Sequence, residues 1–495
     1  MGLILGSTCF VLMVMFFNPR PEQPEVGLMA AVAAVMAIFW ITEAIPLAAT
    51  ALIPAVALPL TGILESGTVS KAYINSIIFL YLGGFIIALS MEKWNLHRRI
   101  ALNIINLVGR RADLLVLGFM VASAFLSMWI SNTATSVMML PIGLAIIAKM
   151  EEELGKDRTH SLSLVLMLCI AYGCSIGGVA TLVGTPTNLA FVRIFHESFP
   201  DAPYIAFGQW LIIGIPYSMV MLVLTWFLLT RVIYPVDPSL TLDRSIIKKE
   251  LEALGPLRAT EMRVLVVFLL TVFLWTFRRD LNVGIFQIPG WSSLWEGFQN
   301  IDDGTIAIAT ALLLFFIPAG REAEGRRLIE TDVFKRVPWD IIILFGGGFA
   351  LAAGFTASGL SRFIGESFAG YGALPVILLI IMICIGVTFL TELTSNVATL
   401  SMLLPILASM AVSLNINPLV FAIPATISAS MAFMMPVATP PNAVVFGSQR
   451  IRIFEMAKAG IILNLLAIAL TIAAVYIFFP FVTGTSMDAF PAWAE

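Results

Sequence analysis

The chain is divided into long apolar blocks that carry almost no charge. They include 26–42, 210–230, 264–277, 304–318, 376–390 and 459–480. Several approach or exceed the roughly 17–25 residues that a helix needs to cross a bilayer, and they do not alternate as transmembrane β-strands do. Only 12% of the residues are charged, against roughly 25% in soluble domains. We therefore expect an all-α, multi-pass protein of the plasma membrane that contacts lipid.

Composition and histidine placement disfavour two other classes of function. The net charge of −3 gives no reason to expect a nucleic-acid partner. The histidines His97, His160 and His196 all lie outside the apolar core segments. No nucleophile–base pair or metal-ligand spacing is recognisable, so we do not expect an enzyme.

A short polar motif occurs twice at a fixed spacing. Ser131-Asn132-Thr133 lies inside one apolar stretch, and Ser395-Asn396-Val397 lies 264 positions later inside another. Between 125–142 and 389–406, ten of eighteen aligned positions are identical. Matches this extensive indicate an internal repeat.

Two further pairs of segments support the repeat. The same spacing of 264 aligns Gly83-Gly84 with Gly347-Gly348, and these glycines favour close helix packing. At a spacing of 254, 184–188 matches 438–442, each containing a Thr-Pro-x-Asn sequence. Three matches in the same order make chance an unsatisfactory explanation.

Lysine and arginine placement indicates how the two halves are oriented. In the first half, 92–113 carries five basic residues and 64–78 carries one, whereas in the second half 320–338 carries five and 357–375 one. These residues are Lys93, Arg98, Arg99, Arg110 and Arg111; Lys71; Arg321, Arg326, Arg327, Lys335 and Arg336; and Arg362. Because basic residues gather on the cytoplasmic side, equivalent segments lie on opposite sides. The sequence thus predicts an inverted repeat, which is recurrent in secondary transporters.

This reasoning gives a complete predicted organisation. About eleven transmembrane helices and two re-entrant hairpins are expected, with 47–62 as one span and helix breaks near 184–188 and 438–442. The segments are an N-terminal helix, 1–25; a first inverted repeat, 26–232, with a hairpin at 113–148 and a broken helix at 161–195; a cytoplasmic connection, 233–262; and a second inverted repeat, 263–495, with a hairpin at 373–411 and a broken helix at 418–450.

The polar tips of the hairpins and the helix breaks favour a site for small ions. Proline removes a backbone donor and interrupts a helix, and Ser-Asn-Thr is typical of a helix N-cap. Helix N-termini and Ser, Thr and Asn donors suit a carboxylate, while freed carbonyls and side-chain oxygens suit Na⁺.

The core segments contain no basic residue that could neutralise an anion. Across 115–148, 165–192, 376–408 and 420–447 the only charged residue is Glu392. An unpaired anion in such surroundings would cost several kcal/mol, so co-bound cations would favour anion binding. Glu392 itself is open to two interpretations, a functional intramembrane carboxylate or a group facing a protein-lined surface, because its repeat partner is Met128.

The paired Ser-Asn-Thr-type motifs, the paired Thr-Pro-x-Asn segments and the inverted halves resemble the divalent anion/sodium symporters. The resemblance covers nearly the whole chain. It implies a homodimer with scaffold and transport domains that moves by an elevator mechanism. It also implies Na⁺-coupled symport of C4-dicarboxylates such as succinate, malate and fumarate.

The resemblance also implies roles for individual residues. One Na⁺ site would use Ser127, Ser131, Asn132 and the backbone of Gly184; the other would use Thr391, Asn396 and the backbone of Thr394 and Ala438. The di- or tricarboxylate would be bound by Asn132, Thr133, Thr185, Pro186, Ser395, Asn396, Val397, Thr439 and Pro440.

Val397 departs from the strict pattern, because it removes a hydroxyl that a second Ser-Asn-Thr motif would offer. Citrate therefore remains an alternative substrate, as does sulfate. A dicarboxylate exchanger of the same fold is a further alternative.

Overall fold

The computed structural model describes residues 1–109, 111–241, 245–282, 287–320, 326–368, 374–487 and 489–494. Within these ranges the chain is folded mainly into helices, with one antiparallel strand pair, β1 (Leu281–Asn282) and β2 (Gln287–Ile288). The α-helices are α1 (Gly2–Phe16), α2 (Pro24–Thr42), α3 (Leu47–Thr50), α4 (Ile53–Leu60), α5 (Ser66–Tyr73), α6 (Ser76–Lys93), α7 (Leu96–Val108), α8 (Ala112–Ser127), α9 (Asn132–Leu154), α10 (Lys156–Val179), α11 (Pro186–Ser198), α12 (Phe207–Phe227), α13 (Ser245–Ala253), α14 (Ala259–Thr276), α15 (Asp303–Phe316), α16 (Trp339–Ser358), α17 (Leu360–Phe368), α18 (Val376–Thr391), α19 (Asn396–Ser413), α20 (Leu419–Ala429), α21 (Pro440–Phe446) and α22 (Ile453–Thr483).

Among the described residues, nine helical segments are long and apolar enough to cross a membrane. They are Pro24–Thr42, Ser66–Lys93, Asn132–Leu154, Lys156–Val179, Phe207–Ile233, Ala259–Thr276, Trp339–Ser358, Asn396–Ser413 and Ile453–Thr483. Further apolar helices, such as α1 and α15, are shorter. The chain is therefore a helical, multi-pass membrane protein, as its composition predicts.

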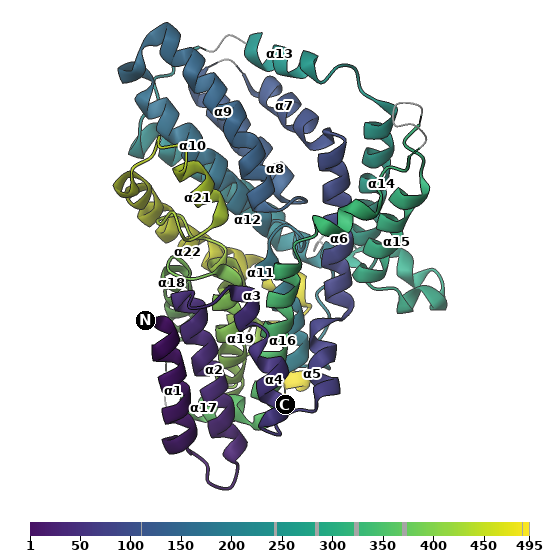
Figure 1. The fold of residues 1–495 in the computed structure, drawn as a ribbon, viewed down its shortest axis with the longest axis vertical. Coiled ribbons are helices and arrows are strands. Elements are labelled where there is room, and N and C mark those ends of the chain that lie inside the picture. Colours follow the sequence, from purple (N-terminus) through teal and green to yellow (C-terminus); the bar gives the residue numbers. More distant parts are fainter. Residues whose placement is uncertain are drawn as a thin grey trace.

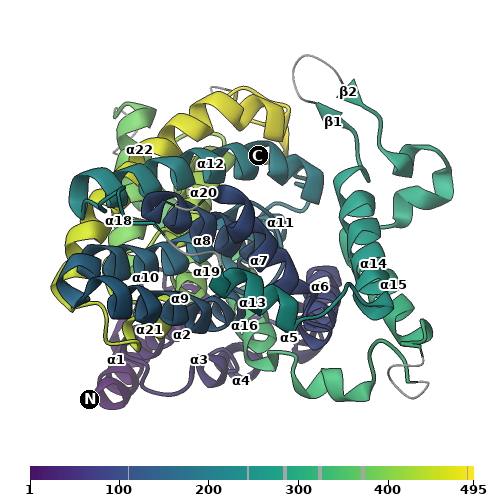
Figure 2. The same cartoon turned by 90° about the horizontal axis from the view of Figure 1, so that it is seen from above.

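Helix α10 lies at the centre of this arrangement. Its membrane-length window is entirely buried within the protein, and it packs against α8, α9, α21 and α12. By contrast, α14 and α15 stand together at the periphery, as both views show (Figures 1 and 2). Elements from both halves of the sequence therefore pack around a helix that contacts little or no lipid.

Each segment that the sequence predicts as a re-entrant hairpin contains two helices joined by a short turn. In the first, α8 ends at Ser127 and α9 begins at Asn132, and we call residues 128–131 tip 1. In the second, α18 ends at Thr391 and α19 begins at Asn396, and we call residues 392–395 tip 2. Residue 373, where the second hairpin is predicted to begin, and the basic residues Arg110 and Arg321 lie outside the described residues.

The two helix breaks lie earlier in the chain than the proline motifs suggest. Residues 180–185 separate α10 from α11, and residues 430–439 separate α20 from α21; we call these segments break 1 and break 2. Pro186 and Pro440 do not interrupt helices but begin the next ones. The first helical position tolerates proline because its N–H would have no helical partner there.

Two connecting segments also differ from simple spans or loops. The region 47–62, predicted as one span, consists of the short helices α3 and α4. The predicted connection 233–262 contains α13 and the start of α14. Arg99 of α7 fastens this connection, since its Nε donates to Glu261 Oε2 at 2.5 Å and its Nη1 donates to the Gly255 carbonyl at 3.0 Å.

Glycines allow several helices to approach closely. A Cβ atom on Gly83 of α6 would lie 2.5 Å from the carbonyl carbon of Ala307 in α15. A Cβ atom on Gly347 of α16 would lie 2.3 Å from the carbonyl oxygen of Ala51. Both distances are far below van der Waals contact, so the glycines serve the close packing that the sequence predicts.

Candidate functional site

Tip 1 is organised by hydrogen bonds within its own motif. Ser131 is the N-cap of α9, and its Oγ accepts from the Ala134 backbone N–H at 3.2 Å. The Ser127 hydroxyl donates to Asn132 Oδ1. Thus Ser127, at the end of one helix, and Asn132, at the start of the next, place two side-chain oxygens next to each other.

Break 1 packs directly against tip 1. Thr181 Oγ1 donates to the Met128 carbonyl at 2.5 Å and accepts from the Gly184 N–H at 3.0 Å. A Cβ atom on Gly184 would lie 2.9 Å from the Ser127 carbonyl oxygen, and one on Gly178 would lie 2.8 Å from Asn132 Oδ1. The backbone of break 1 and the end of α10 therefore approach Ser127 and Asn132, the two residues that flank tip 1.

A small cavity lies where tip 1 and break 1 face α6. It is lined by Ser131, Gly184 and Pro186 together with side chains of α6, and it measures about 20 Å³. A space of about 10–15 Å³ or more holds one water molecule, so this cavity suits a bare cation or a water rather than a dicarboxylate. All four residues predicted for the first Na⁺ site thus lie in one neighbourhood.

Tip 2 repeats the hydroxyl–amide contact of tip 1. The Thr391 hydroxyl lies 2.7 Å from Asn396 Oδ1 and 2.9 Å from the Ala429 carbonyl at the end of α20, and both oxygens can accept its proton. Thr394, the third predicted ligand, hydrogen-bonds through its hydroxyl to the Leu390 carbonyl at 3.0 Å. Ala438 is buried in break 2.

Glu392 joins tip 2 to break 2. Its Oε1 accepts from the N–H groups of Phe433 and Met434 at 2.7 and 2.9 Å, and its Oε2 accepts from the Met435 N–H at 3.0 Å. Asn464 of α22 also donates to Oε1 at 2.7 Å. All four donors are neutral, and the side chain is only 3% exposed. Of the two interpretations left open by the sequence, these contacts support the protein-facing one.

The asparagines of the Thr-Pro-x-Asn segments hold the breaks in shape. Asn188 Nδ2 donates to the carbonyls of Val179 and Thr181 at 3.2 and 2.8 Å. Asn442 Nδ2 likewise donates to the carbonyls of Ala432 and Met435 at 3.1 and 3.0 Å. These bonds pair carbonyls at the end of α10 and within the breaks that have no helical partner.

Break 2 contacts the two helices that flank break 1. Thr187 Oγ1 of α11 lies 2.5 Å from Ser430 Oγ at the end of α20. The Tyr172 hydroxyl of α10 donates to the Phe433 carbonyl of break 2 at 2.7 Å. Both predicted sites therefore belong to one hydrogen-bonded unit made from both halves of the chain.

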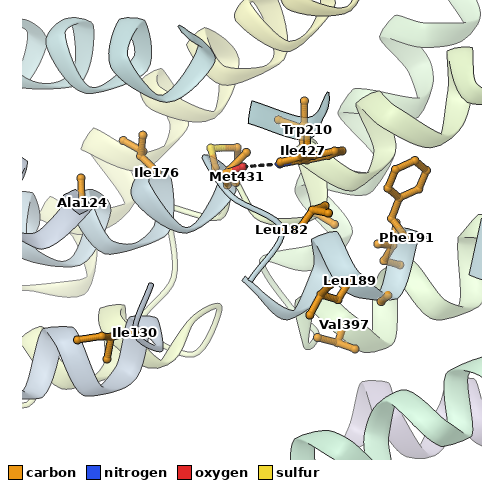
Figure 3. Close-up of a cluster of buried hydrophobic side chains, with 14 of the residues drawn as sticks. Ala124, Ile130, Ile176, Leu182, Leu189, Phe191, Trp210, Val397, Ile427 and Met431 are labelled. Carbon is orange, nitrogen blue, oxygen red and sulfur yellow. Dashed lines mark hydrogen bonds between the residues drawn. The ribbon is translucent and has the colours of Figure 1, made fainter. Parts of the chain in front are cut away.

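The third residues of the two motifs occupy different surroundings. Thr133 is exposed, whereas Val397 is buried and only 6% exposed. Figure 3 shows Val397 beside Leu189 of α11 within a cluster of apolar side chains. The two motifs are thus equivalent in backbone and in their asparagines, but not at this position.

The remaining residues predicted to bind substrate lie at the breaks or at the start of α19. Thr185 is buried and its hydroxyl lies 3.3 Å from that of Thr187. Thr439 is the N-cap of α21, with its hydroxyl accepting from the Asn442 N–H at 3.3 Å. Ser395 is the half-buried N-cap of α19, and Pro440 is exposed.

Sequence reasoning did not identify several residues that position the site. Thr181 connects tip 1 to break 1, and Asn464 connects α22 to Glu392. Neither belongs to the repeated motifs, so comparison of the two halves gives no signal for them. Asn188 and Asn442 are repeated, and that repetition could have singled them out.

Comparison with known proteins agrees with this architecture. A family model described as the sodium:sulfate symporter transmembrane region matches residues 3–484. A sodium-dependent dicarboxylate transporter, SdcS, of Staphylococcus saprophyticus is 42% identical over 488 residues, covering 98% of this chain and 92% of that protein. The protein of the same name from Staphylococcus aureus is 43% identical over 493 residues, with the same coverage.

Solved structures show the same fold at low sequence identity. The YdaH transporter of Alcanivorax borkumensis aligns with a TM-score of 0.56 at 14% identity, over 85% of this chain and 88% of that one. MtrF of Neisseria gonorrhoeae aligns with a TM-score of 0.58 at 14% identity, over 95% and 96% of the two chains. The family match spans nearly the whole sequence, and the chain therefore belongs to the sodium:sulfate symporter family, as a plasma-membrane transporter with Na⁺ as its coupling ion and not an enzyme.

Proposed function

We propose that this protein takes up C4-dicarboxylates such as succinate, malate and fumarate together with Na⁺. The observation that carries the proposal is the pair of equivalent hydroxyl–amide contacts, Ser127 with Asn132 and Thr391 with Asn396. Neutral oxygens in this arrangement suit Na⁺. The relatives' names, which give sodium-dependent dicarboxylate transport, support the choice of substrate class.

The two tips would each hold one Na⁺. Ser127, Ser131, Asn132 and the Gly184 carbonyl would form the first site; Thr391, Asn396 and the carbonyls of Thr394 and Ala438 would form the second. Two oxygens that now share a proton can both turn toward a cation, because a hydroxyl rotates freely to suit its partner. Each cation would replace the hydrogen bond between the hydroxyl and the amide oxygen, and both oxygens would then be ligands of the cation.

The carboxylates would be bound between the tips by Asn132, Thr133, Thr185, Pro186, Ser395, Asn396, Val397, Thr439 and Pro440. The helices that begin at these tips and after these breaks present N–H groups that favour an anion. No arginine or lysine forms a described ion pair with either tip. Bound Na⁺ would supply the missing positive charge, and this would couple the two binding events.

Movement would follow an elevator mechanism in a homodimer with inverted repeats. The tips, the breaks and α10 are joined by hydrogen bonds, whereas only a cavity of about 20 Å³ separates tip 1 from α6. Because the tips and breaks belong to one hydrogen-bonded unit, they would move together relative to α6 during transport. The helices left in place would form the scaffold and the dimer contact.

Uptake of radiolabelled succinate into proteoliposomes, with and without an inward Na⁺ gradient, tests this proposal. We expect uptake to require external Na⁺ and to be inhibited by unlabelled malate and fumarate. Uptake that does not depend on Na⁺ but requires succinate inside the vesicle would instead identify an exchanger.

A second candidate substrate has support of its own. The matched family model is described by sodium and sulfate, and Val397 removes one hydroxyl from the second motif. Inhibition of Na⁺-driven uptake by sulfate or citrate, and not by succinate, would favour one of these anions over a C4-dicarboxylate.

A further inference from the structure

A second and larger cavity lies away from the tips, and it has a volume of about 320 Å³. Pockets that bind small molecules commonly have volumes of about 300–1,000 Å³. Its polar lining comes from α11, the segment that follows α14, the segment before α15 and the start of α6. The polar residues that matter most are Ser76, Arg193, His196, Arg278, Arg279 and Asp302.

This cavity faces the predicted outer side of the membrane. Helix α14 begins within the last residues of the predicted cytoplasmic connection 233–262 and ends at Thr276, so Arg278 and Arg279 follow its far end. None of the residues that line the cavity belongs to the tips or the breaks. It is therefore separate from the Na⁺ and substrate sites proposed above.

Three nitrogen atoms around this cavity are buried without a described hydrogen-bond partner. They are Arg193 Nε, His196 Nδ1 and Arg278 Nη2. Arg278 is only 3% exposed, and its Nε and Nη1 already bind Asp303 Oδ1 and the Ile301 carbonyl, at 2.5 and 3.2 Å. Arg193 Nε and Arg278 Nη2 can only donate, whereas His196 Nδ1 donates in one of the two neutral tautomers and accepts in the other. Two unpartnered arginine donors at one cavity indicate a missing acceptor.

Two of the three arginines that line the cavity are paired with a carboxylate. Glu197 pairs with Arg193, and Asp303 pairs with Arg278. Asp302 lines the cavity, but its Oδ1 accepts from the Thr305 N–H and hydroxyl at 2.7 and 2.8 Å.

Arg279 has no described carboxylate partner. Its guanidinium lies 5.4 Å from the centre of the Tyr204 ring, and its Nη1 donates to the Tyr204 carbonyl at 3.5 Å. The Arg279 guanidinium and the two unused arginine donors lie at the same cavity as one unpaired carboxylate, that of Asp302.

We infer that this cavity is an outer binding site for a small carboxylate. A guanidinium presents paired donors that match a carboxylate, and Arg278 Nη2 and Arg193 Nε would complete its hydrogen bonds. A ligand here would contact both α11, which follows break 1, and the peripheral pair α14–α15. The cavity would hold an anionic substrate at the outer face.

Binding at the outer cavity can be measured separately from binding at the tips. In purified protein carrying Asn132→Ala and Asn396→Ala, in Na⁺-free buffer, calorimetry with succinate should still show one binding event. Adding Arg279→Gln should weaken it at least about tenfold, and Arg279→Lys should weaken it less. The matched control is Arg362→Gln, an exposed arginine on the predicted outer side that does not line the cavity, and it should leave binding unchanged.

Each result decides the inference. Absence of succinate binding in the tip variant, or equal binding after Arg279→Gln in protein with an unchanged melting temperature, would overturn it. Binding of inorganic phosphate but not succinate would overturn the assignment to a carboxylate. This measurement does not depend on the proposed function, so it stands even if the wild-type protein does not take up succinate.

A transport measurement extends the inference and does rest on the proposed function. In the otherwise wild-type protein, Arg279→Gln should raise the KM for external succinate several-fold and leave the maximal rate unchanged. High salt should remove the difference, because it screens the attraction. An unchanged KM at low salt would contradict a recruiting role.

Discussion

The Thr391 hydroxyl lies 2.7 Å from Asn396 Oδ1, and 264 positions earlier the Ser127 hydroxyl makes the same contact with Asn132. Each pair connects the last residue of one hairpin helix to the first residue of the next. The contact brings together two oxygens that a cation could bind. It also restrains the distance between the two helix ends across the turn, because both residues belong to helices.

Removing either hydroxyl should weaken Na⁺ binding. Ser127→Ala or Thr391→Val should raise the Na⁺ concentration for half-maximal uptake about tenfold, which corresponds to ~1.4 kcal/mol for a lost ligand. Titration of uptake against external Na⁺ measures this. Thr310→Val is a suitable control, since that buried hydroxyl binds only carbonyls of its own helix, and it should leave Na⁺ dependence unchanged.

Removing either asparagine should stop transport. Asn132→Ala and Asn396→Ala each delete a side chain proposed to contact both Na⁺ and the carboxylate, so uptake should fall to the level of empty vesicles. Both asparagines are half-buried at helix starts, so folding should be retained, as judged by gel filtration in detergent. Wild-type uptake in either variant would mean that the tips are structural only.

Glu392 should be required for the stability of tip 2. Glu392→Gln exchanges an oxygen for an NH₂ group among backbone N–H donors, and hydrogen bonds to charged groups contribute roughly 1.5–3 kcal/mol each. We expect a lower melting temperature and loss of uptake, with a smaller effect for Asn464→Ala. Glu152→Gln, at a carboxylate whose side chain is 76% exposed, should have neither effect. A fully stable Glu392→Gln protein would refute the anchoring role.

The adjacent glycines of α6 should differ sharply in their tolerance of a methyl group. Gly83→Ala would press against the Ala307 backbone, whereas the nearest atom to a Cβ on Gly84 is 3.8 Å away. Gly83→Ala should therefore lower the melting temperature, and Gly84→Ala should not. Equal stability of the two variants would show that α6 and α15 are free to separate.

Much of the fold could be predicted because the membrane restricts the choices. Lipid cannot hydrogen-bond an exposed backbone, so apolar length and the repeated Ser-Asn motif predicted helices and short turns. The register of the breaks could not be predicted in the same way. Proline can interrupt a helix or begin one, and the sequence alone does not decide which applies to Pro186 and Pro440.

The candidate site was predictable where the two halves match and obscure where they differ. Asn132 and Asn396 were found by comparison of the halves, and Ser127 and Thr391 through the resemblance to the symporters. The partners of Glu392 were not, because they lie in break 2 and α22, and its repeat equivalent is Met128. Burial of Val397 and exposure of Thr133 also escaped prediction, since burial depends on neighbours such as Leu189 that are distant in sequence.

The contact between Thr187 and Ser430 has no equivalent in the other half of the repeat. Ser430 follows the last residue of α20, a position that Ala180 holds after α10. Thr187 corresponds to Pro441 in the repeated motif. The equivalent contact in the other half would thus join Ala180 and Pro441, whose side chains cannot hydrogen-bond to each other. If the halves descend from one duplicated gene segment, they have diverged at this contact since the duplication.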